Sequence, residues 1–376
     1  MNIFTKKKFC IVATSGISLL NFRGNLINTI ADAGNCVTCI SIEDCKSMDA
    51  IMDSLNATYL QVKGDRTSIG IIGGIRMILG YVSAFRKVRP DIIYLYMSKP
   101  IAFGAIAARL SRIEHINILV NGLENAFYRT TVKDFFIRAV MSKLYKIACR
   151  NADNVFFQNQ DDLNFFVKNK ILTRDNACIV NGSGVDMQHF YLAPLPKAPV
   201  VLMAARLLWS KGIREFLEAV TTVKKSLPSL KVLLVGGLDN NDEALTKEDL
   251  ETYIKKYDIE YCGYSRDIRR QIEKASIFVL PSYHEGLPRV VLEAMAMGRP
   301  IITTDAPGCK ETVVDGLNGF LVPVRNSLML SDKLLTLAKD EQLRESMGQA
   351  SRRLCEKKFE ISKINHFIIN KITKSL

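Results

Sequence analysis

The sequence has no uninterrupted apolar run of the roughly 18 residues that a membrane-spanning helix requires. Lysines 6 to 8 followed by FCIVAT resemble a signal peptide only faintly, because the apolar stretch is short, β-branched and lacks a small-residue cleavage pattern. We expect this segment to be a first β-strand and the protein to stay in the cytoplasm.

The cysteines are odd in number and are not grouped in the sequence. The nine of them are scattered over 376 residues, which argues against a disulfide framework and favours a reducing compartment. Cys36 and Cys39 form a C-x-x-C with Cys45 nearby, but a zinc site needs more ligands and no histidine is close in sequence. We therefore expect an apolar strand there, and no bound metal or other cofactor in the protein.

The composition is that of a globular protein, and only its charge is unusual. Hydrophobic residues make up 48% and charged residues 24% of the chain, which excludes extensive disorder. The formal net charge of +13 indicates an anionic partner. Nucleic acid, anionic lipid and a phosphorylated small molecule are the candidates.

Short apolar runs alternate with longer segments of helical period along the whole chain, which predicts parallel sheets covered by helices. In the first half the expected strands are 8–14, 36–42, 58–63, 91–97, 115–120, 154–158 and 177–181. In the second half they are 200–204, 231–236, 260–263, 277–281, 301–304 and 319–322.

A stretch with three prolines and no clear period separates the two halves. We expect a first Rossmann-like domain over 1–190, a linker over 191–199 and a second Rossmann-like domain over 200–376. Ligands of such sheets bind beyond the carboxyl ends of the strands, so the active site is expected in a cleft between two facing domains. The first strand is followed by TSGIS, which lacks the G-x-G-x-x-G dinucleotide fingerprint.

Residues 129–150 read as a basic amphipathic helix. Its apolar side chains are Phe135, Phe136, Val140 and Leu144, and its basic ones are Arg129, Lys133, Arg138, Lys143, Lys146 and Arg150. Such a helix can lie on an anionic membrane surface. Alternatively, the apolar stripe packs on the sheet and the basic residues are simply solvated.

The stretch IFVLPSYHEGLPRVVLEAMAMGRP carries the most informative pattern. A buried strand ends in a turn with Glu285 and Gly286, and a helix is expected to open with Pro288 at its first position. The backbone N–H groups of Gly286 and Leu287 then lie at a positive helix end, which is an anion site. Glu293 lies about 7.5 Å further along that helix. Since carboxylates repel phosphate, Glu285 and Glu293 are expected to bind hydroxyl groups on either side of it.

A second basic element follows the strand 200–204. Arg206 and Lys211 come just before a helix and can reach the same cleft, where a guanidinium and an ammonium bind phosphate oxygens. Two cations and a helix end would stabilise a departing diphosphate without a metal. The chain also contains no Asp-x-Asp pair, the usual ligand of the metal in metal-dependent sugar transferases.

These residues resemble a known family. The pattern E-G-x-P-x4-E-A looks like the signature of the retaining GT-B glycosyltransferases of family 4, and the resemblance extends to Arg206…Lys211-Gly212, Val235-Gly236-Gly237 and DGLNG at 315–319. It implies that Arg206 and Lys211 clamp the diphosphate. It also implies that Glu293 accepts ribose hydroxyls, that Glu285 holds the transferred sugar, and that Gly16, Gly286 and Leu287 contact the donor.

One position departs from the family. Many members have a histidine after the strand 115–120, where this chain has Asn121. Asn121 cannot act as a general base but can donate hydrogen bonds to the sugar or the acceptor, and Glu124 is either a base or a helix-start carboxylate. In the family's front-face displacement the leaving phosphate can itself take the acceptor proton, so catalysis is not excluded.

The resemblance includes transferases that extend undecaprenyl-diphosphate-linked oligosaccharides. It implies a nucleotide-sugar donor, a lipid-linked saccharide acceptor and peripheral contact with the inner face of the cell membrane, without nucleic acid. Arg66 and Ser68, after a strand of the first half, are candidate acceptor contacts. Two alternatives are a sugar-nucleotide epimerase of similar shape, which would consume donor without acceptor, and a basic nucleic-acid-binding protein.

Overall fold

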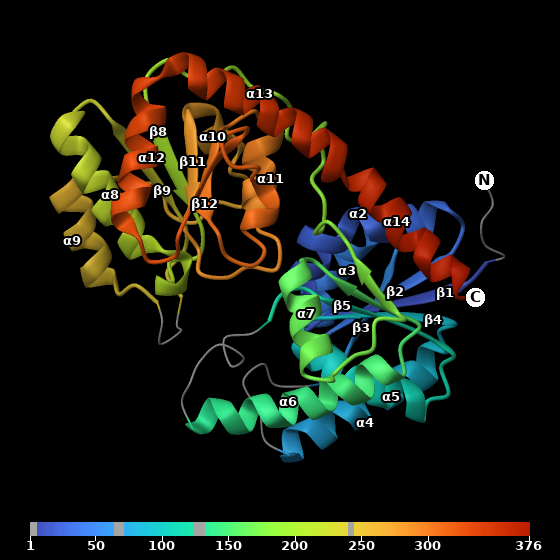
Figure 1. Cartoon of the computed structure of the whole chain (residues 1–376). Coiled ribbons are helices and arrows are strands. Elements are labelled where there is room, and N and C mark those ends of the chain that lie inside the picture. Colours follow the sequence, from blue (N-terminus) through green and yellow to red (C-terminus); the bar gives the residue numbers. More distant parts are fainter. Residues whose placement is uncertain (1–5, 64–70, 124–131, 240–243) are drawn as a thin grey trace. The chain divides into compact units, whose positions relative to one another are not determined.

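The computed structural model describes residues 6–63, 71–123, 132–239 and 244–376 (Figure 1). Contacts divide the chain into two compact units: unit 1, Met1–Ser183 with Lys363–Leu376, and unit 2, Gly184–Ser362. Within the described ranges, all thirteen expected strands are present and all pair in parallel, so the predicted α/β class with two Rossmann-like sheets is confirmed.

Unit 1 contains a seven-stranded sheet of order β3-β2-β1-β4-β5-β6-β7. Its strands are β1 (Lys8–Val12), β2 (Cys36–Ser41), β3 (Thr58–Gln61), β4 (Ile92–Tyr96), β5 (His115–Val120), β6 (Asn154–Phe157) and β7 (Ala177–Ile179). Its helices are α1 (Gly16–Ser18), η1 (Leu19–Arg23), α2 (Gly24–Asp32), α3 (Cys45–Asp53), α4 (Ile71–Val88), η2 (Pro100–Gly104), α5 (Ala105–Leu110), α6 (Val132–Arg150), α7 (Gln160–Lys168) and α14 (Ile361–Lys374).

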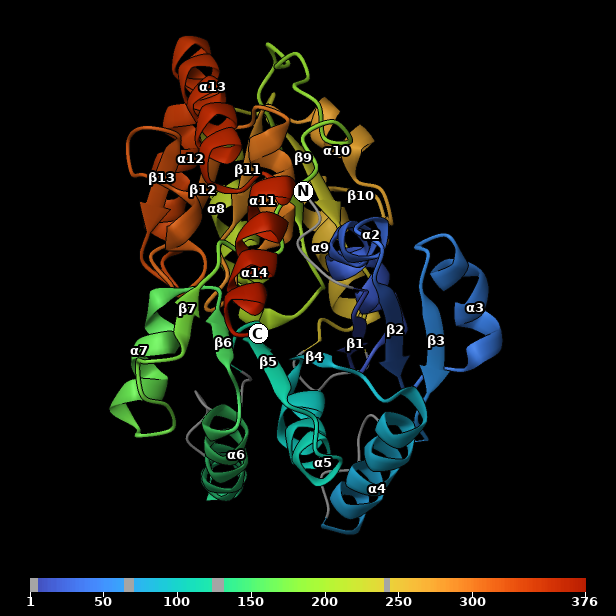
Figure 2. The ribbon, with the colours of Figure 1, turned by 90° about the vertical axis from the view of Figure 1, so that its right-hand side faces the viewer.

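Both faces of this sheet are buried, because successive residues of a strand point to opposite faces. In β1, Phe9 and Ile11 join the core formed with α2, α3 and α14. Cys10 and Val12 join the core on the other face, formed with α4, α5, α6 and α7. Figure 2 shows α4, α5 and α6 along one face of this unit. In β2, Cys36 is exposed whereas Cys39 is buried in the core.

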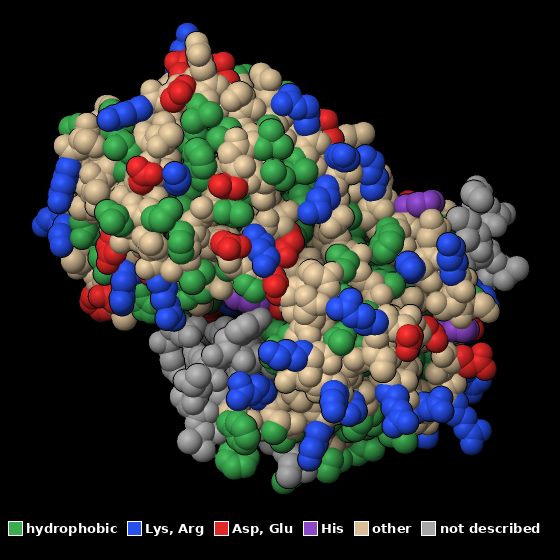
Figure 3. Space-filling view, viewed as in Figure 1, with side chains coloured by type: hydrophobic (Ala, Val, Ile, Leu, Met, Phe, Trp, Pro, Cys, Tyr) green, Lys and Arg blue, Asp and Glu red, His purple; other side chains and the backbone are tan. Residues whose placement is uncertain are grey.

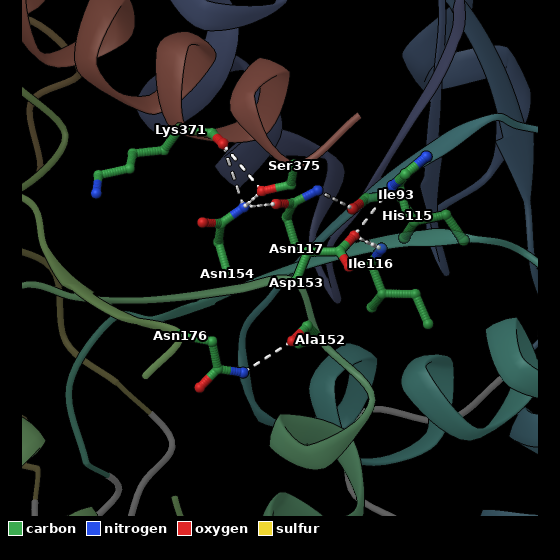
Figure 4. Close-up of polar contacts among 10 residues, drawn as sticks. All are labelled: Ile93, His115, Ile116, Asn117, Ala152, Asp153, Asn154, Asn176, Lys371 and Ser375. Carbon is green, nitrogen blue, oxygen red and sulfur yellow. Dashed lines mark hydrogen bonds and ion pairs between the residues drawn. The ribbon is translucent and has the colours of Figure 1, made fainter. Parts of the chain in front are cut away.

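The C-terminal helix α14 packs on unit 1, although the sequence suggested that it belongs with the second domain. A polar contact fixes its end (Figure 4). The side-chain amide of Asn154 donates to Asn117 Oδ1 at 2.8 Å and to Ser375 Oγ at 2.9 Å, and Asn117 in turn donates to the carbonyl of Ile93. The last residues are therefore tied directly to the strands of unit 1.

Unit 2 contains a six-stranded sheet of order β10-β9-β8-β11-β12-β13. Its strands are β8 (Val200–Ala204), β9 (Lys231–Val235), β10 (Glu260–Tyr261), β11 (Ile277–Leu280), β12 (Ile301–Thr304) and β13 (Gly319–Val322). Its helices are η4 (Trp209–Lys211), α8 (Ile213–Ser226), α9 (Lys247–Tyr257), α10 (Arg269–Lys274), α11 (Arg289–Ala296), η5 (Lys310–Thr312), α12 (Ser327–Lys339) and α13 (Glu341–Lys358).

The proline-containing segment 191–199 lies within unit 2. The buried guanidinium of Arg299 donates to the carbonyls of Ala193 and Pro194 at 2.9 and 3.1 Å, and that of Arg344 donates to the carbonyl of Lys197 at 2.6 Å. Burial lowers the pKa of Arg299 to about 10. Two buried cations therefore satisfy the backbone carbonyls of a segment that has no strand or helix of its own.

Over the ranges that the structure describes, no helix combines the length and the apolar composition needed to cross a bilayer.

Candidate functional site

Each sheet has one point where the strand order reverses, between β1 and β4 in unit 1 and between β8 and β11 in unit 2. The loops that follow the two strands diverge there and leave a crevice beyond their carboxyl ends, where ligands of such sheets bind. In unit 2 these loops carry Arg206 and Lys211 after β8 and Glu285 after β11. The strand order therefore brings distant residues to one edge.

Lys211 and Glu285 meet at this edge. The Lys211 ammonium donates to Glu285 Oε1 at 2.6 Å, and the side chains are only 16% and 17% exposed. Gly212 permits the approach: its φ is +73°, and a Cβ on it would lie 2.0 Å from the carbonyl oxygen of Pro281. A glycine is required here by both conformation and space.

The loop that carries Glu285 is fixed by contacts on both sides. The backbone N–H of Tyr283 donates to the carbonyl of Ser210 at 2.9 Å, and its hydroxyl donates to Glu215 Oε1 at 2.8 Å. Burial, together with the Glu215 carboxylate, raises the pKa of Tyr283 to about 12. Glu215 itself is buried at the start of α8. Tyr283 therefore ties the Glu285 loop to the segment that carries Lys211.

The loop after β12 supports Glu285 from the other side. The Glu285 N–H donates to the carbonyl of Pro307 at 3.0 Å, and a Cβ on Gly308 would lie 2.2 Å from the Glu285 carbonyl oxygen. The neighbouring Cys309 is buried, which raises the pKa of its thiol to about 12. Its thiol therefore stays protonated and packs as an apolar group.

Arg206 lies in the same loop as Lys211, but its guanidinium points to another residue. Nη1 is 3.3 Å from Asp239 Oδ2, and the Arg206 side chain is 66% exposed. Such exposed ion pairs contribute little free energy, so the guanidinium can leave Asp239 for a stronger anion. No motif in the sequence indicates Asp239 as its partner.

Glu293 occupies a more buried position on α11. Its carboxylate lies 2.9 Å from Arg289 Nε one turn earlier. Burial raises the pKa of Glu293 to about 7, an effect that Arg289 partly offsets. The i, i+4 spacing of Arg289 and Glu293 in the sequence is the signal for this ion pair, because residues four apart are neighbours on one face of a helix. Helix α11 begins at Arg289, one residue later than predicted, with Pro288 as its N-cap after Gly286 and the buried Leu287.

In unit 1, the loop after β1 binds a carboxylate. Glu43 Oε2 accepts from the backbone N–H groups of Gly16 at 2.5 Å and Ile17 at 3.2 Å, and Oε1 accepts from the Ser15 hydroxyl at 3.0 Å. A Cβ on Gly16 would lie 2.6 Å from that carboxylate and from the sulfur of Met48. The loop therefore presents donors to an anion, and in this structure the Glu43 carboxylate accepts from them.

Asn121 stands at the carboxyl end of β5 beside the loop that follows β4. Its Oδ1 accepts from the backbone N–H of Met97 at 3.3 Å, and Met97 has a left-handed φ of +70°. The Asn121 Nδ2 group has no partner among the described residues and can donate to a ligand. The other first-half candidates, Arg66, Ser68 and Glu124, lie outside the described residues.

Two motifs of the second half have structural roles. Gly236 packs against the carbonyl of Ala205, to which a Cβ would approach within 2.0 Å. In the DGLNG turn, the buried Asn318 accepts from the N–H of Val314 at 2.7 Å and donates to the carbonyl of Thr312. These residues shape the loops in which they lie.

Two protein families match the chain. The family described as "Glycosyl transferase 4-like" matches residues 8–159, and the family "Glycosyl transferases group 1" matches residues 187–354. The two matches fall on unit 1 and unit 2 and together cover the loops described above.

Curated relatives extend over most of the chain. The chain is 28% identical over 349 residues to N,N'-diacetylbacillosaminyl-diphospho-undecaprenol alpha-1,3-N-acetylgalactosaminyltransferase of Campylobacter jejuni, covering 89% of this chain and 90% of the relative. It is 23% identical over 309 residues to UDP-Gal:alpha-D-GlcNAc-diphosphoundecaprenol alpha-1,3-galactosyltransferase of Escherichia coli, covering 78% of each.

Among solved structures, Anabaena Alr3699/HepE in complex with UDP and glucose superposes with a TM-score of 0.79 at 18% identity, over 98% of this chain and 99% of that one. At this identity the likeness establishes the fold.

Proposed function

We propose a function from the premise that the chain belongs to the GT-B glycosyltransferases with a 4-like and a group 1 domain. In this proposal the enzyme moves a hexose or N-acetylhexosamine from a UDP-sugar onto a polyprenyl-diphosphate-linked saccharide, with retention of configuration. The reaction would contribute to surface polysaccharide or other glycan assembly. The observation that carries the proposal is the contact between Lys211 and Glu285 at the switch point of unit 2, the point between β8 and β11 where the strand order reverses.

In this proposal unit 2 binds the donor. Lys211 and Arg206 bind the diphosphate, helped by the positive end of α11. Glu285 exchanges its ion pair with Lys211 for hydroxyls of the transferred sugar, while Glu293 accepts from the ribose. Because Lys211 and Glu285 already neutralise each other when no donor is bound, a ligand with phosphates and hydroxyls can replace both interactions at once.

The transfer breaks the bond between the anomeric carbon and the diphosphate oxygen. The acceptor hydroxyl forms the new bond on the same face, and its proton passes to an oxygen of the leaving phosphate. Positive charge held in place before the reaction lowers the cost of the negative charge that develops on that phosphate. Two side-chain cations and a helix end can supply this charge without a metal ion. Gly16 would add backbone donors, and Asn121 an amide donor.

The acceptor is proposed from the relatives, two of which act on undecaprenyl-diphosphate-linked sugars by name. A lipid-linked acceptor places the enzyme at a membrane surface, and the net charge of +13 favours an anionic one. Asn121, Arg66, Ser68 and Glu124 are the proposed acceptor-side residues.

Product analysis tests this function. A panel of UDP-sugars is first screened for thermal stabilisation, since a true donor raises the melting temperature by mass action. The stabilising donor is then incubated with and without a polyprenyl-diphosphate-linked saccharide. We expect an extended saccharide and free UDP only when acceptor is present. Conversion of the donor in the absence of acceptor would indicate an epimerase instead and would contradict the proposal.

A further inference from the structure

We infer that α4 and α6 of unit 1 form a docking surface for an anionic lipid bilayer, here called the α4–α6 surface. It consists of Ile72, Ile75, Leu79, Phe135, Phe136 and Val140 with the basic residues Arg76, Arg86, Lys87, Arg138, Lys143, Lys146 and Arg150. The inference deepens the proposed function by naming the face that contacts the membrane, but the binding it predicts can be measured without any substrate.

Exposed apolar side chains are concentrated on this face. Eleven large apolar side chains among the described residues are more than half exposed, and six of them belong to the α4–α6 surface. Phe136 and Ile72 are 65% and 70% exposed. A monomeric protein rarely leaves such side chains together on its surface without a partner.

The exposure of α6 side chains counts against one of the two interpretations of this helix. Phe135, Phe136 and Val140 face solvent, so the expectation that this stripe packs on the sheet is wrong for them. The helix packs instead through Tyr145, Ala148 and Cys149, which are all buried. Tyr145 also makes an edge contact with Phe166 of α7, with ring centroids 5.4 Å apart. Phe135, Phe136 and Val140 are therefore not part of the hydrophobic core.

The two helices present their apolar residues at the same end. Each follows a parallel strand and runs back against it, so the N-terminal halves of both lie towards the carboxyl ends of the strands. Ile72, Ile75 and Leu79 fall in that half of α4, and Phe135, Phe136 and Val140 in that half of α6. This is the edge of the sheet where ligands bind. A lipid-linked acceptor would enter from the apolar end.

The charge on these helices complements an anionic membrane. Together α4, α5 and α6 contain nine Lys and Arg residues and a single acidic residue, Asp134. Arg86 and Lys87 end α4, and Lys143, Lys146 and Arg150 occupy the second half of α6. Figure 3 shows hydrophobic and basic side chains together along the lower edge of unit 1, where Figure 1 places α4 and α6.

An anionic bilayer is the occupant that explains both features. Aromatic and aliphatic side chains enter the boundary between headgroups and acyl chains, while lysine and arginine bind lipid phosphates. A second copy of the chain would bring two strongly basic faces together, which charge repulsion opposes. We therefore expect the bilayer, and not self-association, to cover the surface.

Co-sedimentation with lipid vesicles tests the inference. The full chain is expected to bind vesicles of phosphatidylglycerol and phosphatidylcholine, more weakly as salt rises, and to bind phosphatidylcholine alone poorly. Lys143→Glu with Lys146→Glu should weaken binding at least about tenfold, since each basic residue near such a surface contributes roughly fivefold. Phe135→Ser with Phe136→Ser should weaken it by about tenfold as well.

Matched controls come from unit 2. Lys225→Glu with Lys255→Glu makes the same charge change, and Leu317→Ser with Leu328→Ser makes the same polarity change at exposed positions. These variants should bind vesicles like the wild type. All variants should keep their melting temperature and their turnover of a short-chain, water-soluble acceptor, which separates loss of docking from loss of function.

Three outcomes would overturn the inference. The first is vesicle binding by the α6 variants within about twofold of wild type. The second is equal loss in the unit 2 controls. The third is concentration-dependent dimerisation in sedimentation velocity that Phe135→Ser with Phe136→Ser abolishes, which would assign the surface to a second copy of the chain.

Discussion

The ammonium of Lys211 lies 2.6 Å from the carboxylate of Glu285, across 74 residues of sequence. The two groups come from the loops on either side of the switch point of the unit 2 sheet, and Gly212 lets those loops touch. The proposed phosphate-binding cation and the proposed hydroxyl-binding carboxylate thus form an ion pair with each other. This pairing keeps both groups in place at a partly buried edge, where an unpaired charge would be costly.

Tyr283 should act as a positioning residue for this pair. Tyr283→Phe removes the hydrogen bond to Glu215 and should lower kcat about tenfold or more, with a smaller change in the KM for donor, because misplacing a reacting group costs rate more than binding. The single variant Glu215→Gln, whose amide oxygen can still accept from the Tyr283 hydroxyl, should retain most of the wild-type activity. Equal loss of kcat and of thermal stability in both variants would instead indicate a purely structural contact.

Donor binding should depend on the ionisation of Glu293. Its pKa is raised to about 7, so the carboxylate that we propose to accept ribose hydroxyls forms only as the pH passes that value. The affinity for a UDP-sugar should rise up to about tenfold between about pH 6 and pH 8. A UDP-sugar is the suitable ligand, because the terminal phosphate of UDP itself titrates near about pH 6.

Glu293→Gln provides the control for that titration by calorimetry. The variant should bind the donor with an affinity that is nearly independent of pH over this range. The two proteins should also differ in stability without ligand. In the wild type the raised pKa of Glu293 makes the free energy of unfolding fall as the pH rises from about 4.5 to about 7, and Glu293→Gln should lack this contribution. A pH profile shared by wild type and variant would contradict the assignment.

Gly212→Ala should disrupt the contact between the two loops. The new Cβ would lie 2.0 Å from the Pro281 carbonyl oxygen at a φ of +73°, so the backbone must shift. We expect a loss of stability above the roughly 1–2 kcal/mol of left-handed strain alone, and a large loss of turnover. Gly316→Ala is the matched control, because its φ is +75° and nothing lies within 4 Å of the added Cβ. Equal effects in denaturant unfolding and turnover would exclude a special role for Gly212.

Helix α14 should be required for the stability of unit 1. Ile368 is buried in the core that α14 shares with β1, so Ile368→Ala should cost about 2–5 kcal/mol in denaturant unfolding. The neighbouring Phe367 is much more exposed, and Phe367→Ala should cost far less. Similar losses for the two substitutions would mean that α14 does not pack as described.

Much of the fold followed from the sequence, because buried parallel strands such as 200–204 and 277–280 are continuous apolar runs with clear ends. Lys211 and Glu285 could also be placed at one edge of the sheet in advance, since both follow strands and the carboxyl ends of parallel strands share an edge, but their ion pair could not. The packing of α14 on unit 1 could not be foreseen, because its amphipathic pattern fits either sheet. The pairing of Arg206 with Asp239 and of Gly16 with Glu43 could not be foreseen either, because such contacts depend on which loops the tertiary structure brings together.

The most direct test of the account is the rate of sugar transfer in Lys211→Met and Glu285→Gln with the matching UDP-sugar and lipid-linked acceptor. Each should lose at least about 100-fold in kcat, as expected for removal of one preorganised contact at the departing diphosphate or the transferred sugar. Lys224→Met, which removes an ion pair with Asp258 elsewhere in unit 2, should keep near-normal turnover. Folded Lys211 and Glu285 variants that both turn over within about threefold of wild type would contradict the account.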